Sequence, residues 1–249
     1  MKITVIGGTG LIGRRLAAHL RDAGHEVFAA ARSTGVNTIS GEGLAAALEG
    51  VEVVVDASNS GYGDAADMQR FFAMSTANLL TAARAASVGH FIALSAVGAD
   101  TLKDGYFRAK RGQEERICDA GIPFTIVRST PFFEFIYKIV DAGGDGDRMR
   151  LAPVTMQPIA ADDVVKTLAG FVTREPANDI VEIAGPDIFG LADLALEILT
   201  ANEDPRWISV DPDAHYFGAS FDGEPLTCSR PQAAPTRFED WLRDWIAFA

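Results

Sequence analysis

The sequence predicts an α/β fold, a Rossmann-type doubly wound parallel sheet with a small C-terminal subregion. Short apolar runs rich in β-branched residues alternate with segments of helical periodicity through the first half of the chain. Such a repeated order of strand, helix and strand requires right-handed crossovers, which place parallel strands in one doubly wound sheet. The 249 residues, of which 48% are hydrophobic, suffice for one sizeable core.

The first half of the chain supplies most of these elements. The run at 3–6 is β-branched and nearly all apolar, as in a strand that is buried on both faces. Apolar residues then recur at three- and four-residue steps from Ile12 to Leu20, which predicts a helix, and Gly24 is placed to end it in the left-handed conformation. The same patterns predict strands at 27–31, 51–55, 91–94 and 124–127 and helices at 43–48, 68–86 and 106–120.

The pattern becomes less regular after about Pro131. The segment 141–150 is rich in Gly and Asp and is predicted to be a mobile loop. Helical periodicity returns at 161–172, where Asp162 or Asp163 is placed to cap the N-terminal end. Beyond it we expect a strand at 180–183, a helix at 191–199, an irregular segment at 201–235 with five prolines, and a last helix at 238–248. The irregular segment either shapes a substrate pocket or is a surface excursion without a role.

The run GGTGLIG at 7–13 carries a chemical signal. Gly8, Gly10 and Gly13 have the G-x-G-x-x-G spacing between a buried strand and a helix, and Gly7 adds the wider G-x-x-G-x-x-G spacing. In such a loop the glycines permit a tight turn, a close approach of the backbone to a pyrophosphate and close packing of helix on strand. Free N–H groups at the helix start then face the negative charge. The alternative is that the glycines serve only the turn.

The end of the second predicted strand indicates which dinucleotide binds. A carboxylate about twenty residues past the glycines would favour NAD, but the chain has AAARS at 29–33. The guanidinium of Arg32 can bind a 2′-phosphate through two hydrogen bonds, and Ser33 can add a hydroxyl donor. These residues favour NADP(H) over NAD(H). The alternative for Arg32 is a solvated surface side chain.

A candidate catalytic group accompanies the fourth predicted strand. Tyr106 and Lys110 are four residues apart, so on a helix they share one face, and Ser95 ends the strand before them. A tyrosine becomes a useful acid or base when a nearby ammonium favours its phenolate. Lys110 would do this and also hydrogen-bond the nicotinamide ribose, while Ser95 would hold a carbonyl oxygen as it gains charge. The alternative is that a Tyr and a Lys share this helix face by chance.

Several segments, taken in order, resemble one family. They are GGTGLIG, Arg32, VVVDAS at 53–58, FIALSAVGAD at 91–100, YFRAKRGQEE at 106–115, PFTIVRSTPFFEF at 123–135 and PIAADDVV at 158–165. Together they are similar to the short-chain dehydrogenase/reductase superfamily, and most of all to its atypical NmrA-like and isoflavone-reductase-like branch. The resemblance covers most of residues 1–172 and becomes thin after Ile183.

This resemblance implies a site on particular residues. Tyr106 and Lys110 match the family's YxxxK pair, and Ser95 matches its serine, although it precedes Tyr106 by eleven residues, slightly fewer than usual. Some members of this branch bind the nucleotide as sensors without turning it over. The positions that match cofactor contacts are Gly7, Thr9, Gly10, Leu11, Ile12, Gly13, Arg32, Ser33, Ala57, Ser58, Lys110, Pro131 and Phe132.

An aromatic group follows the strand predicted at 124–127. It consists of Phe132, Phe133, Phe135 and Tyr137. These side chains either wall a pocket for a flat or apolar substrate or pack the core beneath the C-terminal subregion.

Composition narrows the classes of partner. The chain has 22 Lys plus Arg against 34 Asp plus Glu, a net charge of -12, so its overall field repels nucleic acid and anionic membranes. No stretch approaches the roughly 18 apolar residues of a membrane span, and the apolar run at the start breaks at Gly7, so no secretory leader is expected. Cys118 and Cys228 form no disulfide framework, which favours the reduced cytoplasm. The four scattered histidines predict no metal site.

We therefore expect one domain over 1–249, with a dinucleotide-binding core at 1–135. The mixed portion at 136–249 is expected to return partly to that core and to shape the pocket on the substrate side. The expected function is NADP(H)-dependent reduction of a small carbonyl, quinone or enone, with the proton from Tyr106. The alternative is a non-catalytic NADP(H)-binding redox sensor or regulatory protein of the NmrA type. The oligomeric state is not predicted.

Overall fold

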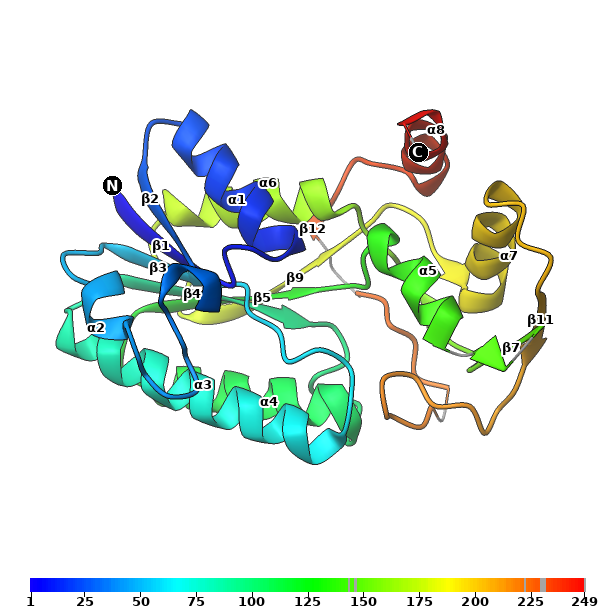
Figure 1. The fold of residues 1–249 in the computed structure, drawn as a ribbon, viewed down its shortest axis with the longest axis horizontal. Helices are drawn as coiled ribbons and strands as arrows, with labels where there is room; N and C mark the ends of the chain where they lie inside the picture. Colours follow the sequence, from blue (N-terminus) through cyan, green and yellow to red (C-terminus); the bar gives the residue numbers. More distant parts are fainter. Residues whose placement is uncertain (143, 146, 222, 229–231, 249) are drawn as a thin grey trace.

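A parallel sheet forms the centre of the molecule (Figure 1). The structure is a computed structural model that describes residues 1–142, 144–145, 147–221, 223–228 and 232–248. In these residues the sheet has seven strands in the order β2, β1, β3, β4, β5, β9, β12, and each neighbouring pair is parallel. The strands are β1 (Lys2–Ile6), β2 (Glu26–Ala30), β3 (Val53–Asp56), β4 (His90–Ala96), β5 (Phe124–Ser129), β9 (Asp179–Ala184) and β12 (Gln232–Ala233). This arrangement confirms the predicted fold class.

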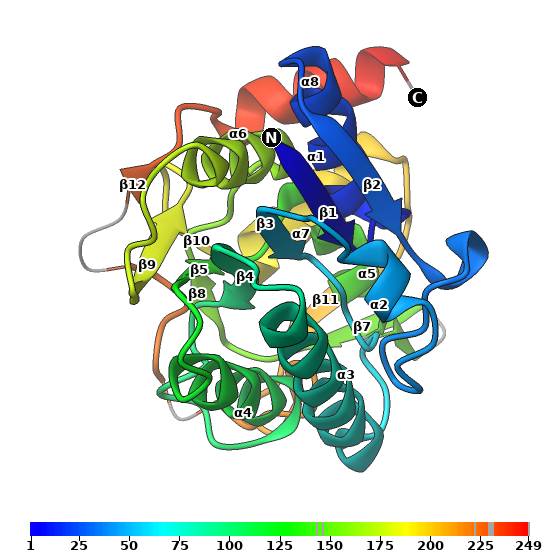
Figure 2. The ribbon, with the colours of Figure 1, turned by 90° about the vertical axis from the view of Figure 1, so that its left-hand side faces the viewer.

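Helices cover both faces of the sheet, as Figures 1 and 2 show. α1 (Leu11–Asp22) and α6 (Ala161–Val172) pack on one face, and α2 (Leu44–Ala47), α3 (Ala65–Ala85) and α4 (Gly105–Cys118) pack on the other. Strand side chains alternate between the two resulting cores, because successive residues of a strand point to opposite faces. The predicted elements up to residue 129 are present, with boundaries within three residues of the expected ones.

The order of the strands reverses at β1. β2 lies on one side of β1 and β3 on the other, and Ile6 at the end of β1 is level with both Ala30 and Asp56. The loops that leave β1 and β3 therefore diverge from the same edge of the sheet. In open α/β sheets, ligands bind at such a reversal, outside the carboxyl ends of the strands.

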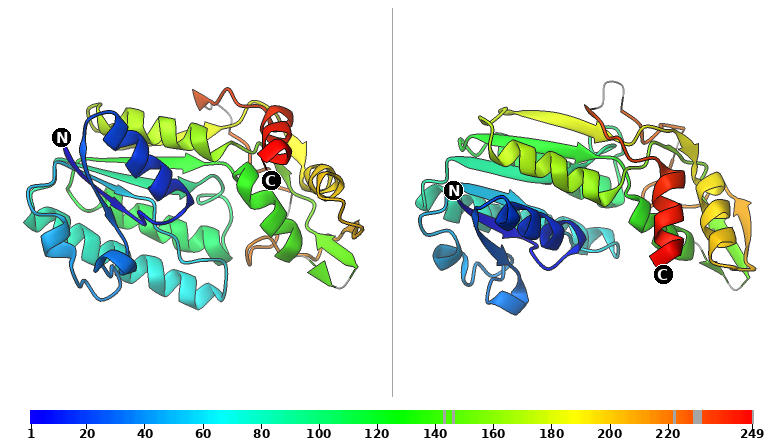
Figure 3. Two further views of the ribbon diagram at one scale, coloured as in Figure 1. Left: turned by 45° about the horizontal axis from the view of Figure 1, so that its top comes forward. Right: turned by 90° about the horizontal axis from the view of Figure 1, so that it is seen from above.

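A second lobe lies beyond this edge (Figure 3). It has its own hydrophobic core, which includes Ile136, Met149, Leu194 and Phe238. It contains α5 (Phe133–Ala142), α7 (Leu191–Ala201), α8 (Phe238–Phe248) and the strands β6 (Gly144–Asp145), β7 (Arg148–Leu151), β8 (Thr155–Met156), β10 (Phe189–Gly190) and β11 (Trp207–Val210). The chain returns to the central sheet through α6, β9 and β12.

Two expectations for this half of the chain were wrong. The segment 141–150 contains a strand, Arg148–Leu151, because Met149 and Leu151 alternate into the core of the second lobe and the backbone pairs with Trp207–Val210. Residues 143 and 146 of that segment lie outside the described residues. The segment 201–235 is likewise not wholly irregular, since it supplies β11 and β12. A short strand of this kind needs a partner distant in sequence, which periodicity does not identify.

The predicted N-terminal cap of α6 was also wrong. Neither Asp162 nor Asp163 caps the helix, which begins after Ala160 without a side-chain cap. Glu134 of α5 accepts a hydrogen bond from the backbone N–H of Ala161 instead, at 3.1 Å. The buried Asp163 accepts one from the backbone N–H of Thr236 at 3.0 Å, so it ties the last segment of the chain to α6.

Candidate active site

The glycine-rich run forms a tight turn between β1 and α1. Gly7 has φ of +74°, and a Cβ there would lie 2.8 Å from the carbonyl oxygen of Ala57. A Cβ on Gly8 would lie 2.6 Å from the Cα of Ala29, and one on Gly13 would overlap the carbonyl oxygen of Gly7. The glycines therefore hold β1, α1 and the neighbouring backbone closer together than any side chain permits.

The start of α1 faces the carboxyl edge of the sheet with its donors free. Gly10 is the N-cap residue, and no side chain caps the helix. Among the described residues, the backbone N–H groups of Leu11 and Ile12 have no acceptor. Unpaired N–H groups and the positive end of the helix dipole together make such a turn a binding site for an anion, in particular a phosphate.

A cavity of about 540 Å³ runs from this turn to Tyr106. It is bounded by the ends of β1, β2, β3, β4 and β5 and by the second lobe. Of the predicted cofactor residues, Gly13, Ser33 and Lys110 are not among those that line it. The ones that do are Gly7, Thr9, Gly10, Leu11, Ile12, Arg32, Ala57, Ser58, Pro131 and Phe132.

Arg32 marks the far end of the cavity. It begins a short 3-10 helix, Arg32–Thr34, directly after β2, and it is exposed. Its guanidinium has no ion-pair partner in the described part of the chain, whereas Ser33 is exposed and outside the cavity. The hydroxyl of Thr38 lines the same end, and sequence reasoning missed it because it lies in the irregular segment after β2.

Tyr106 lies on the first turn of α4, with its ring in a cluster of aromatic side chains. The centroid of its ring is 5.1 Å from that of Tyr62 and 6.0 Å from that of Phe72. Burial raises the pKa of its hydroxyl well above the ordinary value of 10, and Tyr62, Tyr216 and Asp56 raise it further. Tyr106 is therefore a neutral phenol at neutral pH, and it is a weaker acid than an ordinary tyrosine.

Lys110 does not meet the cavity. Its side chain is 1% exposed, and its ammonium donates to the carbonyl oxygen of Leu94 at 2.8 Å and to Gln113, over the ring of Phe72. Burial lowers its pKa to about 8, although Asp56 and Glu114 act in the opposite direction. The groups that raise the pKa of Tyr106 are Tyr62, Tyr216 and Asp56, so the stabilisation of its phenolate by Lys110 stays a prediction. The bond of Lys110 to a nucleotide ribose likewise stays a prediction.

Ser95 lines the cavity, but its proton is already used. Its hydroxyl donates to Glu114 at 2.6 Å, and Glu114 in turn accepts two hydrogen bonds from Arg128. A hydroxyl has one proton, so in this arrangement Ser95 can only accept a hydrogen bond from a ligand. The predicted donation to a carbonyl oxygen requires the bond to Glu114 to break.

The aromatic group after β5 is divided between two places. Phe132 and Phe135 line the cavity, whereas Phe133 is buried in the core of the second lobe. Tyr137 packs against that core, and its hydroxyl accepts from Arg206 at 3.3 Å. The group therefore divides between the cavity and the core, and the substrate that Phe132 and Phe135 would contact stays a prediction.

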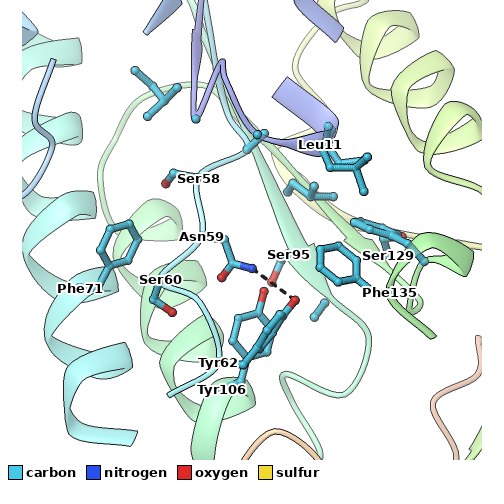
Figure 4. A pocket seen from close by; sticks show the side chains of 18 of the residues that line it. Leu11, Ser58, Asn59, Ser60, Tyr62, Phe71, Ser95, Tyr106, Ser129 and Phe135 are labelled. Atoms are coloured by element: carbon cyan, nitrogen blue, oxygen red, sulfur yellow. Dashed lines mark hydrogen bonds between the residues drawn. The ribbon is translucent and has the colours of Figure 1, made fainter. Parts of the chain in front are cut away.

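Sequence reasoning missed a second set of cavity residues. Figure 4 shows Asn59, Tyr62 and Ser60, from the loop after β3, beside Tyr106 and Ser95. Asn59 donates to the hydroxyl of Tyr62 at 3.3 Å. Tyr216 and Phe217 approach the same place from the irregular segment near the C-terminus. No motif marks these residues, because only the folded chain brings them together.

The described residues show neither a metal site nor a membrane-spanning helix. Within the described ranges, no group of three or more His, Cys, Asp or Glu residues is placed to hold a metal ion. In the same part of the chain, no helix combines the length and the apolar character that crossing a membrane requires.

Comparison with known proteins agrees with this geometry. Residues 7–173 match the family model described as NAD(P)H-binding. The chain is 25% identical over 213 residues to the photosystem II assembly factor Ycf39 of Cyanophora paradoxa, covering 78% of this chain and 66% of that protein. It is 34% identical over 144 residues to the (4-alkanoyl-5-oxo-2,5-dihydrofuran-3-yl)methyl phosphate reductase of Streptomyces griseus, covering 52% of this chain and 48% of that protein.

Solved structures share the fold over the whole chain. The structure of DesIV, a dTDP-glucose 4,6-dehydratase from Streptomyces venezuelae with NAD and TYD bound, is similar with a TM-score of 0.74 and 18% identity. The match covers 100% of this chain and 96% of that one. Against the first curated relatives the chain is shorter, since it covers 46% to 66% of their lengths.

Proposed function

Because this chain belongs to the NAD(P)H-binding family, we propose that it is an NADP(H)-dependent oxidoreductase that reduces a small carbonyl, quinone or enone. One observation carries the proposal: a single cavity joins the glycine-rich turn to the hydroxyls of Tyr106 and Ser95. A dinucleotide held at one end and a substrate held at the other would then share one cavity.

The residues present suit the nucleotide. A pyrophosphate needs N–H donors and a backbone without side chains, and the turn at Gly7 and Gly10 offers both, with the free N–H groups of Leu11 and Ile12. Ala57 and Ser58 continue this end of the cavity after β3. Pro131 and Phe132 bound it after β5, where the reactive ring of the cofactor is proposed to lie.

The preference for NADP(H) over NAD(H) rests on Arg32. Its exposed guanidinium is free of ion pairs among the described residues and lines the end of the cavity that lies past β2. An arginine binds a phosphate monoester through two charge-assisted hydrogen bonds. Thr38 adds a second donor in the role first assigned to Ser33.

The chemistry divides between cofactor and protein. NADPH, when bound, supplies a hydride. The substrate gains this hydride and one proton, so two electrons pass to it and NADP⁺ is left. The hydroxyl of Tyr106 donates the proton, which water then replaces, and its raised pKa keeps it protonated before the step. Lys110, buried below the floor of the cavity, acts as a positioning residue, since its ammonium donates a hydrogen bond to the carbonyl oxygen of Leu94 and so holds the backbone of β4 in place.

A second candidate function is nucleotide binding without turnover, in a redox sensor or regulatory protein. Two observations favour it: the proton of Ser95 is committed to Glu114, and Lys110 lies outside the cavity. The Cyanophora paradoxa relative is named an assembly factor. In either function we propose a reducing, cytoplasmic location, supported by the free thiols of Cys118 and Cys228.

A turnover experiment separates the two candidates. The purified chain is incubated with NADPH and a panel of aldehydes, ketones, quinones and enones, and the loss of NADPH absorbance and the reduced product are followed. We expect one acceptor class to be reduced with stoichiometric product, and NADPH to bind ~10-fold tighter than NADH by calorimetry. Tight NADPH binding without turnover on the whole panel favours the sensor, and no binding of either nucleotide rejects both candidates.

A further inference from the structure

The cavity ends in a set of aromatic rings around Tyr62. The centroid of the Tyr62 ring is 3.9 Å from that of Phe217, 5.1 Å from that of Tyr106 and 6.0 Å from that of Phe135. We call these four residues the aromatic wall; it joins the loop after β3 and α4 to two segments of the second lobe. Figure 4 shows three of them, Tyr62, Tyr106 and Phe135, gathered beside Ser95.

The aromatic wall keeps ring surface open to a ligand. Tyr62 is 39% exposed, and Phe217, Tyr106 and Phe135 are only partly buried. Aromatic side chains stack best against flat, conjugated molecules, with ring centroids ~4.5–7 Å apart. The shape and chemistry of this wall therefore suit a planar ring system rather than a flexible or sugar-like one.

Among the described residues, no charged side chain lines the end of the cavity at the aromatic wall. Among the described lining residues, the charged one is Arg32, which lies at the opposite end after β2. Lys110 is buried beneath the cavity, and Lys138, with its ammonium 5.4 Å from the centroid of Phe135, is exposed and does not line it. Asp56 is also beneath, bonded to Ser58 and Gln113.

An anionic substrate would consequently be unpaired. Taking a carboxylate or phosphate out of water without a cationic partner is unfavourable. A neutral carbonyl, by contrast, needs only a hydrogen-bond donor. The hydroxyl of Tyr106, in the wall, and the amide of Asn59, beside it, are such donors.

We infer that the substrate is an uncharged, planar, conjugated carbonyl or quinone stacked on the aromatic wall, that Tyr62 determines this specificity, and that phosphorylated or carboxylated compounds are rejected. The inference rests on the proposed reduction and names its substrate class. It also separates this chain from the Streptomyces griseus relative, whose name specifies a methyl phosphate substrate.

Binding of two probes with the same ring tests the role of charge. The full chain, saturated with NADPH, whose nicotinamide ring is uncharged, is titrated by calorimetry with 2-naphthamide, which is neutral, and with 2-naphthoate, which is anionic. We expect 2-naphthamide to bind at least ~10-fold tighter. Equal affinities, tighter binding of 2-naphthoate, or no binding of either probe would overturn the inference.

Variants of the wall test the role of Tyr62. Tyr62→Ala is expected to weaken 2-naphthamide ~10-fold, while Tyr62→Phe, which keeps the ring, stays within ~2-fold of the parent chain. Trp207→Ala is the matched control, because Trp207 is an exposed aromatic residue outside the cavity. Thermal unfolding of each variant shows that it is folded. If Tyr62→Ala binds 2-naphthamide as the parent does, Tyr62 does not determine specificity.

A variant that adds a cation reverses the expected selectivity. Asn59 donates to the hydroxyl of Tyr62 at 3.3 Å, so Asn59→Arg places a guanidinium beside the aromatic wall. It is expected to raise the affinity for 2-naphthoate ~10-fold; an unchanged affinity contradicts the charge argument.

These outcomes are distinct from those of the proposed function. Selective binding of 2-naphthamide without NADPH consumption on the whole panel leaves the inference standing and rejects the reduction. NADPH-dependent turnover that prefers 1,4-naphthoquinone-2-sulfonate to the neutral 2-methyl-1,4-naphthoquinone keeps the reduction and overturns the inference.

Discussion

The two ends of the cavity are built in different ways. At the nucleotide end, the proposed pyrophosphate site is one continuous stretch, residues 7–13, that offers backbone N–H groups in a turn with no room for side chains. The opposite end is made of side chains from separate parts of the chain, with Tyr62 and Phe217 in contact across the two lobes. One end therefore depends on backbone geometry, and the other on tertiary packing.

This difference indicates which end of the cavity can change its ligand specificity without a change of fold. Backbone N–H groups read a pyrophosphate in any dinucleotide, so the turn sets the cofactor class and little else. Side chains on loops vary without disturbing the sheet, so Tyr62 and Phe217 of the aromatic wall are free to differ with the substrate. Changes at one end are expected to leave the other end intact, and the predictions below use that independence.

The largest effect is expected from Tyr106→Phe. Loss of the proton donor should lower kcat/KM by ~100- to 10,000-fold while the NADPH affinity stays within ~2-fold. Tyr62→Phe, which removes a neighbouring hydroxyl, serves as the control and should retain most of the rate. Because the pKa of Tyr106 is raised above 10, kcat/KM should show no loss of this donor between about pH 7 and about pH 9. A Tyr106→Phe enzyme as fast as the parent would show that the proton comes from elsewhere.

Gly13→Ala tests the nucleotide end. The added Cβ overlaps the carbonyl oxygen of Gly7, and backbone cannot move aside without opening the turn. We expect calorimetry to show a ~100-fold loss of NADPH affinity, and urea unfolding a loss of ~2 kcal/mol of stability. Gly170→Ala on α6 is the control, since no heavy atom lies within 4 Å of its Cβ position; it should gain up to ~1 kcal/mol. Equal NADPH affinities for the two variants would place the nucleotide away from this turn.

Arg32→Gln tests the choice between the two nucleotides. Loss of the guanidinium should weaken NADPH ~10- to 100-fold and leave NADH unchanged, because only NADPH carries the 2′-phosphate. Arg14→Gln provides the comparison, as Arg14 is an exposed residue on α1 outside the cavity. A parallel fall in affinity for both nucleotides would mean that Arg32 does not read the 2′-phosphate.

Lys110→Met is expected to have the smallest effect, on stability. The pKa of Lys110 is about 8 in the folded protein against an ordinary 10.5, so the unfolded chain holds this proton more tightly. Folding therefore disfavours charged Lys110 below about pH 8, and this penalty disappears as the pH rises from about 8 to about 10.5. Lys110→Met removes this penalty, but it also leaves the buried carboxyl of Asp56 and the carbonyl oxygen of Leu94 without the ammonium, so the free energy of unfolding at neutral pH should change by no more than ~1–2 kcal/mol.

The free energy of unfolding of Lys110→Met, relative to that of the parent chain, should fall as the pH rises above about 8, as measured by urea unfolding at a series of pH values. A difference between the two chains that is independent of pH would mean that the ammonium carries no penalty in the folded state.

Much of the fold was predictable because it is local. The strand at 3–6, the turn at Gly7 and the helix that follows depend on residues within a few positions of one another, and each was found. The all-parallel order of the sheet followed from the repeated crossovers. By contrast, β7 and β11 form only because Arg148–Leu151 pairs with Trp207–Val210, a contact across some sixty residues that no periodicity reveals.

The candidate site likewise has features that depend on local spacing and others that depend on contacts between distant segments. Spacing correctly placed Tyr106 and Lys110 on one face of α4, and both contact the ring of Phe72. It did not show that the two side chains lie in different surroundings: Tyr106 lines the cavity, whereas Lys110, one turn of helix later, is buried in the core. Nor did it show that Glu114, one turn later, accepts the hydrogen bond that the hydroxyl of Ser95 donates.

By itself, the sequence determined the sheet, the glycine-rich turn with its free N–H groups, and the exposed arginine after the second strand, because each depends on short-range backbone geometry or on one side chain at a strand end. Tertiary structure alone decided which groups surround the substrate end. Tyr62, Tyr106, Phe135 and Phe217 meet because the second lobe packs against the carboxyl edge of the sheet, and Lys110 is buried because α4 packs on α3. Contacts between elements distant in sequence determine burial, and burial determines which polar groups remain available for chemistry.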